Sequence, residues 1–219
     1  KNYDLMKKYF FMAIELGCSS SMHNLGYYYH IVEKNYYLMK KYYLMAIELR
    51  DQDSMYNLGH YCKTVEKNYD LMKKYYSMAI ELRDSNAMHS LGNYYYTVEK
   101  NYDLMKKYYS MAVELGDYKS MNNLGNYYKT VEKNYDLMKK YYSMAIELGN
   151  SDAVYNLRLY YKQNENDFSF LKYPDKFGDL IQQRFKKNLD LPQEYYPDFC
   201  QLKNVSGKLR MKQYILKET

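Results

Sequence analysis

The chain has 219 residues, a formal net charge of +6 and 47% hydrophobic residues, which suits a folded protein and is too weakly basic for a dedicated polycation. It contains no apolar run of about 18 residues, the minimum for a membrane-spanning helix, so we expect no membrane insertion. Its three cysteines, Cys18, Cys62 and Cys200, share no paired spacing. This excludes a disulfide framework and a C-x-x-C zinc site and predicts a reducing intracellular compartment.

The predicted elements follow a sequence repeat. The string Lys-Asn-Tyr begins at Lys1, Lys34, Lys67, Lys100 and Lys133, an interval of 33 residues. Periods of about 20–50 residues are typical of stacked supersecondary units, each of which buries its apolar face only against a neighbour. We therefore expect an array of about five repeats over residues 1–163, with a long binding surface rather than a catalytic cleft.

Each repeat reads as two helices, called helix A and helix B here, and both are visible between Asp53 and Arg83. Asn68 is placed to cap helix B, and Asp70 falls in its first turn, where a carboxylate suits the positive helix end. Apolar residues recur at helical spacing in both halves. They are Met55, Leu58, Cys62 and Val65 in helix A and Leu71, Tyr75, Met78, Ala79 and Leu82 in helix B, where Met72 and Tyr76 widen the apolar stripe.

Glycine recurs at two places in the repeat. One follows helix B at Gly17, Gly116 and Gly149, the position at which Gly relieves left-handed backbone, whereas Arg50 and Arg83 stand there in other copies. The second lies inside helix A, at Gly26, Gly59, Gly92 and Gly125. A glycine inside a helix costs about 1 kcal/mol relative to Ala, so we expect two helix backbones to approach closely there. Arg158 replaces this glycine in the last copy, which predicts that its helix packs against something different, such as the C-terminal extension of residues 164–219.

The wording of the repeat resembles the Sel1-like repeat, a relative of the tetratricopeptide repeat. Ala87, Leu91, Gly92 and Tyr95 match the helix-A pattern A-x-x-x-L-G-x-x-Y, and parts of helix B match as well. The Tyr-, Lys- and Asn-rich sequence is also similar to repeat proteins of giant DNA viruses. This similarity would place the protein in the host cytoplasm. The likeness implies an all-α, right-handed α-solenoid of helix-turn-helix repeats and a scaffold or adaptor role. The family's G-x-G loop between the helices is absent here, and T-V-E-K-N replaces it.

The helix-A positions that differ between copies form the candidate binding site. They recur at i, i+4 and i+7, so they share one helix face, which in the resembled family lines the concave wall. We expect this face to form a groove for an extended peptide or a partner helix. The alternative is neutral drift of exposed positions after duplication. The candidate partner-binding residues are His23, Tyr27, His30, Tyr56, Asn57, His60, Lys63, His89, Asn93, Tyr96, Asn122, Asn123, Asn126 and Lys129.

Two other functions stay open besides protein binding. The lysine pairs at 7/8, 40/41, 73/74, 106/107 and 139/140 would form a ridge along helix B, either a solvated face or a contact for nucleic-acid phosphates. The chain could also be a regulatory subunit of an enzyme. No phosphate-binding loop, nucleophile motif or metal-ligand spacing occurs, so we expect no catalytic residue, cofactor or metal.

The last part of the chain, residues 164–219, has a different composition and contains all three prolines. An apolar cluster near Phe168 and Phe170 and an amphipathic pattern from Lys176 to Leu189 predict a helical extension. We expect it to cap the terminal repeat or to act as a separate interaction module, with self-association as one possibility.

Overall fold

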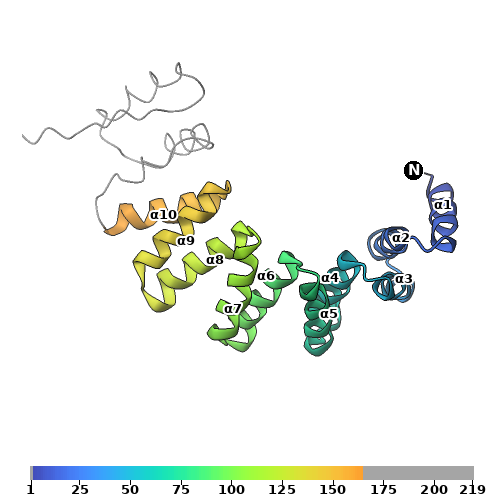
Figure 1. Cartoon of the computed structure of the whole chain (residues 1–219), viewed down its shortest axis with the longest axis horizontal. Helices are drawn as coiled ribbons and strands as arrows, with labels where there is room; N and C mark the ends of the chain where they lie inside the picture. The colour runs from blue at the N-terminus through green and yellow to red at the C-terminus, as the bar shows by residue number, and fades with distance from the viewer. Residues whose placement is uncertain (1, 165–219) are drawn as a thin grey trace, which may run out of the picture. The chain divides into compact units, whose positions relative to one another are not determined.

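A computed structural model describes residues 2–164, with side chains described through residue 161 (Figure 1). This range contains ten α-helices and three π-helical turns and no strand. None of its helices is long and apolar enough to cross a membrane. The elements are α1 (Tyr3–Glu15), α2 (Ser19–Ile31), α3 (Tyr36–Glu48), α4 (Gln52–Tyr61), η1 (Cys62–Glu66), α5 (Tyr69–Glu81), α6 (Ser85–Tyr94), η2 (Tyr95–Glu99), α7 (Tyr102–Glu114), α8 (Tyr118–Tyr127), η3 (Tyr128–Glu132), α9 (Tyr135–Glu147) and α10 (Ser151–Asn164).

The helices alternate as the repeat predicts. The even-numbered helices α2 to α10 are copies of helix A, and the odd-numbered helices α1 to α9 are copies of helix B. Within residues 2–121, α2 packs on α3, α4 on α5 and α6 on α7 (Figure 1). Residues 122–164 form a second compact unit that contains α9 and α10, and α9 packs on α10. The predicted all-α array of helix-turn-helix repeats is confirmed.

Side-chain caps explain where the helices begin. Every copy of helix B starts after an asparagine whose side chain accepts a hydrogen bond from the backbone N–H three residues on, as Asn68 does from Leu71. Asp51 and Asp84 cap α4 and α6 in the same way. Cys18 occupies this place before α2, and its side chain accepts no such bond. The predicted Asn68 cap is confirmed, and Asp70 lies 3.7 Å from Lys73.

Left-handed residues end the helices. Gly17, Gly116 and Gly149 have φ of +79°, +80° and +87° after helix B, as predicted, and Arg50 and Arg83 adopt the same region at 60° and 64°. In the three copies with a π-helical turn, helix A ends in that turn and a left-handed lysine follows it, and in η1 the N–H groups of Lys67 and Asn68 both bond to the carbonyl of Cys62. The predicted burial of Val65 is wrong: it is half exposed. The π-helical turn widens the residue spacing and rotates Val65 away from the Met55–Leu58–Cys62 stripe.

A tyrosine lies under each helix-A glycine. Tyr43, Tyr76, Tyr109 and Tyr142 of helix B are buried, together with the methionine four residues before and the alanine three residues after each. This Met–Tyr–Ala stripe is the most buried part of helix B. In α5 its members Met72, Tyr76 and Ala79 all belong to the predicted apolar stripe, whose other members Leu71, Tyr75, Met78 and Leu82 are half-buried. The expected backbone-to-backbone contact at glycine is wrong. A Cβ on Gly92 would stand 2.6 Å from Cδ1 of Tyr109, so the glycine makes room for the tyrosine ring.

Candidate functional site

The predicted partner-binding residues lie at the surface of the helix-A copies. Tyr27 and His60 are exposed and the other twelve are half-buried, so none is in the interior. We call this set the helix-A face. Many of its members contact the next repeat along the chain, which the sequence did not predict. Their role in partner binding stays a prediction.

Histidines of the helix-A face connect successive helix-A copies. Nδ1 of His23 lies 3.0 Å from the hydroxyl of Ser54 and 3.5 Å from the carboxylate of Asp51, which caps the next helix A. His89 repeats the arrangement 2.9 Å from Ser120 and 3.2 Å from Asp117. Burial raises the pKa of Asp117, but its hydrogen bonds with His89 and Ser120 outweigh burial and leave that pKa below its usual value. These two histidines are therefore engaged inside the array.

The hydroxyls of the buried helix-B tyrosines point toward the helix-A face, and only some of them form a hydrogen bond there. The hydroxyl of Tyr109 donates to Oδ1 of Asn93 at 2.6 Å, and in the second unit the hydroxyl of Tyr142 donates to Asn126 at 2.7 Å. Tyr27 and His60 replace this asparagine in the earlier copies. There the buried hydroxyls of Tyr43 and Tyr76 form no hydrogen bond of good geometry, although Asn57 lies near the first hydroxyl and Ser90 near the second. Burial raises the pKa of both phenols.

Three basic residues gather on α2, α4 and η1, and we call them the basic cluster: His30, His60 and Lys63. His60 is exposed as a whole residue, but its ring is partly desolvated by neighbouring atoms, and this lowers its pKa first, followed by the positive charges of Lys63 and His30. Burial alone lowers the pKa of His30 and of Lys63. The ring of His30 packs edge-on against Tyr61, 5.8 Å between ring centres. None of the three has a carboxylate within ion-pair distance among residues 2–161.

The lysine pairs of helix B are partly neutralised. Nζ of Lys7 lies 3.1 Å from Glu33, Lys73 lies 3.3 Å from Glu99, and Lys40 pairs with Glu66. Each of these lysines also lies over a tyrosine ring of the next helix A, as Lys73 does over Tyr94 at 5.6 Å. The first lysine of these pairs therefore joins neighbouring repeats, which leaves fewer free charges for nucleic-acid phosphates than the sequence indicated.

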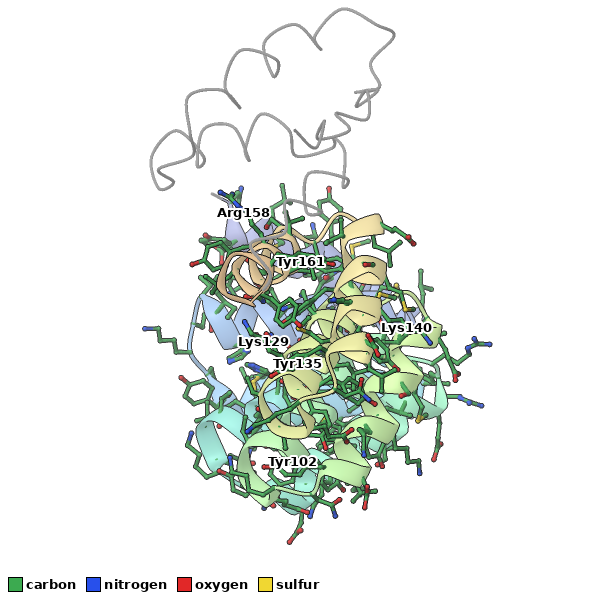
Figure 2. All side chains as sticks on the ribbon, turned by 90° about the vertical axis from the view of Figure 1, so that its left-hand side faces the viewer. Tyr102, Lys129, Tyr135, Lys140, Arg158 and Tyr161 are labelled. Carbon is green, nitrogen blue, oxygen red and sulfur yellow. The ribbon has the colours of Figure 1, made fainter. Side chains whose placement is uncertain are left out.

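In the second unit the helix-A face is uncharged apart from Lys129. Asn156 of α10 donates to Asn122 at 3.2 Å and to Asn126 at 3.4 Å. Lys129 and Lys140 lie on different sides of this unit, one on the helix-A side and one on α9, and Arg158 lies on α10 (Figure 2). Arg158 is half-buried, and burial lowers its pKa to about 10. Its predicted contact with the extension lies outside the described residues, as do the predictions of capping and self-association.

Comparisons with known proteins agree on the architecture. No protein-family model matches the sequence, and no curated protein matches it. A Sel1 repeat protein from Oxalobacter formigenes superposes with a TM-score of 0.65 at 22% identity, covering 81% of this chain and 78% of that protein. The chain has the Sel1-like repeat fold.

Two immunity proteins from Pseudomonas aeruginosa have similar structures. They superpose with TM-scores of 0.54 and 0.52 at 22% and 25% identity, and they cover 90% and 86% of this chain and 80% and 78% of their own lengths. The resemblance that the sequence suggested is therefore confirmed at the level of the Sel1-like repeat fold. The T-V-E-K-N segment fits that fold as a π-helical turn with a left-handed lysine.

Sequence reasoning missed the contacts that join neighbouring Sel1-like repeats. The Lys–Glu pair has a signal, because the two residues are always 26 positions apart. The His–Ser link has one too, at 31 positions, although only two copies show it. Among residues 2–164, no group of three or more His, Cys, Asp or Glu is placed to hold a metal.

Proposed function

We propose that the protein is a non-enzymatic scaffold that binds a protein or peptide partner on its helix-A face. The observation that supports this most is the contrast between the two kinds of helix. The helix-B copies repeat almost the same residues. The Met–Tyr–Ala stripe is buried in α3, α5, α7 and α9, and a lysine of α1, α3 and α5 pairs with a glutamate that follows the next helix A. The helix-A positions vary from copy to copy while staying at the surface. Variation confined to one accessible surface suits recognition, since surface aromatic residues are enriched where proteins meet.

A pair of matched double variants tests the proposal. Tyr27→Ala with His60→Ala removes the two exposed side chains of the helix-A face. Tyr9→Ala with Tyr37→Ala removes side chains that are 60% and 79% exposed on helix-B copies. Because all four side chains are exposed, we expect little change in the thermal midpoint of either variant.

The measurement is quantitative affinity capture from extracts of the source cells, with the wild-type chain as reference. If a partner binds on the helix-A face, its affinity for the first variant should be at least about tenfold weaker than for the wild type. This is the loss expected when an interface residue worth more than about 1.4 kcal/mol is truncated. The second variant should retain the wild-type affinity. If every captured protein is retained equally by both variants, the helix-A face is not the binding surface.

A further inference from the structure

Resting on the proposed function, we propose that the basic cluster of His30, His60 and Lys63 binds an acidic peptide segment, one rich in Asp or Glu side chains. The three residues lie on neighbouring copies of helix A, on the face that varies between repeats. His60 is exposed and the other two are half-buried, so a ligand can reach the cluster from solvent.

The first support is that the cluster lies outside the charge pairs that join neighbouring repeats. Lys7, Lys40 and Lys73 each have a glutamate partner, and His23 and His89 each lie beside an aspartate. The basic cluster has no such partner within the described range. Lys63, a half-buried cation without a carboxylate, loses hydration and gains no charge partner in return, which an incoming carboxylate would reverse. The pKa values of His30 and His60 are lowered, so these imidazoles are neutral near pH 7 and offer N–H donors to the same carboxylate.

The second support is the charge of the surrounding surface. Residues 19–32 and 54–65, which carry the cluster, include no Asp or Glu. The nearest acids in sequence, Glu33 and Glu66, are held by Lys7 and Lys40. The two segments therefore carry the positive charge of Lys63 and no negative charge, although Asp53 precedes the second segment in the first turn of α4. Opposite charge across an interface selects a partner and orients it.

Labelled peptides test the inference directly on the full chain. The probe is a short fluorescent peptide of alternating Glu and Ala, and its control replaces each Glu with Gln. We expect the Glu peptide to bind at least about tenfold more tightly than the Gln peptide, as charge-assisted hydrogen bonds require, and to weaken as salt is added. Equal binding of the two peptides would overturn the inference.

Protein variants show whether the cluster is responsible. Lys63→Gln should weaken binding of the Glu peptide about tenfold, whereas Lys74→Gln, which removes the same charge from an exposed site on α5, should leave it unchanged. Lys63→Arg keeps the charge and should restore binding, which separates a charge effect from a folding defect. Equal losses in Lys63→Gln and Lys74→Gln would mean nonspecific attraction to a basic chain and overturn the inference.

Two further outcomes separate this inference from the proposed function. In the first outcome, the double variant Tyr27→Ala with His60→Ala no longer captures a protein partner, but the Glu peptide does not bind the wild-type chain. This would support the scaffold function and overturn the inference of an acidic ligand. A single-stranded RNA probe that displaces the Glu peptide, and binds through Lys63 more tightly than the peptide does, would assign the cluster to nucleic acid instead and equally overturn the inference.

Discussion

At the scale of single residues, the tyrosine under each helix-A glycine is held in two ways. Tyr109 donates its hydroxyl to Asn93, whereas Tyr76 has His60 in place of that asparagine and makes no hydrogen bond of good geometry, with Ser90 the polar side chain near its hydroxyl. Both rings are equally buried, with at most 1% of their surface exposed. The pair therefore isolates the contribution of one hydrogen bond within nearly identical packing.

Removing the two hydroxyls should have opposite effects on stability. Tyr109→Phe loses a hydrogen bond and should lower the free energy of unfolding by about 1 kcal/mol. Tyr76→Phe removes a buried donor that makes no hydrogen bond of good geometry and should raise it by a similar amount, about 1 kcal/mol. Urea denaturation followed by circular dichroism measures both. Shifts in the same direction for the two variants would contradict the structural difference, and His60→Asn, which supplies the missing acceptor, should stabilise the Tyr76 copy.

At the scale of elements, the turn after helix B shows a second natural comparison. Gly17 and Gly116 adopt left-handed backbone with no atom within 4 Å of an added Cβ. Arg50 and Arg83 adopt the same backbone at φ of 60° and 64°. Since the surroundings of the glycines are open, the difference between the copies is conformational energy rather than packing.

Exchanging these residues should change stability in a defined direction. Left-handed backbone costs a residue other than Gly about 1–2 kcal/mol, and the extra freedom of glycine in the unfolded chain offsets about half of that. Arg83→Gly should therefore stabilise the chain by about 0.5–1 kcal/mol, and Gly116→Ala should destabilise it by about the same amount. Thermal midpoints from calorimetry provide the measurement. A stabilising Gly116→Ala would show that the turn does not constrain the backbone.

At the scale of the whole molecule, the sequence predicted the features that lie within one helix or turn and missed the contacts between helices. The 33-residue period, the Asn68 cap and the glycines after helix B are local signals, and all appear in the structure. The contact of Gly92 with Tyr109, and the pairs between His23 and Ser54 or Lys73 and Glu99, join different helices. Their geometry follows from how helices stack, which periodicity alone does not give.

The sequence predicted which residues of the candidate site lie at the surface, but not which of them already bond to other helices. Spacing placed the varying residues on one side of helix A, and the structure confirms that none is buried. Which of them are already used was hidden, because the partners of His89 and Asn93 come from other helices. The basic cluster differs from those residues because its members have no carboxylate partner within the described range, and the sequence does not show this difference.

The basic cluster should also make the stability of the whole chain depend on pH. The pKa of His30 is lowered by burial, and that of His60 by partial desolvation of its ring and by the charges of Lys63 and His30. The unfolded chain then binds these protons more readily than the folded chain does. The free energy of unfolding should therefore fall as the pH drops through about 6.5, the ordinary value for histidine.

A double variant isolates this contribution. His30→Asn with His60→Asn removes both imidazoles, so its urea midpoint should decrease less than that of the wild type between about pH 7.5 and 5.5, the range in which histidine titrates. Lys74→Gln, which alters charge without touching a histidine, should follow the wild-type curve. If the double variant and the wild type lose stability in parallel, protonation of these histidines is not opposed by folding, and the repulsion within the basic cluster is too weak to affect the fold. A steeper loss in the double variant would reverse the sign and mean that the folded chain favours the charged imidazoles.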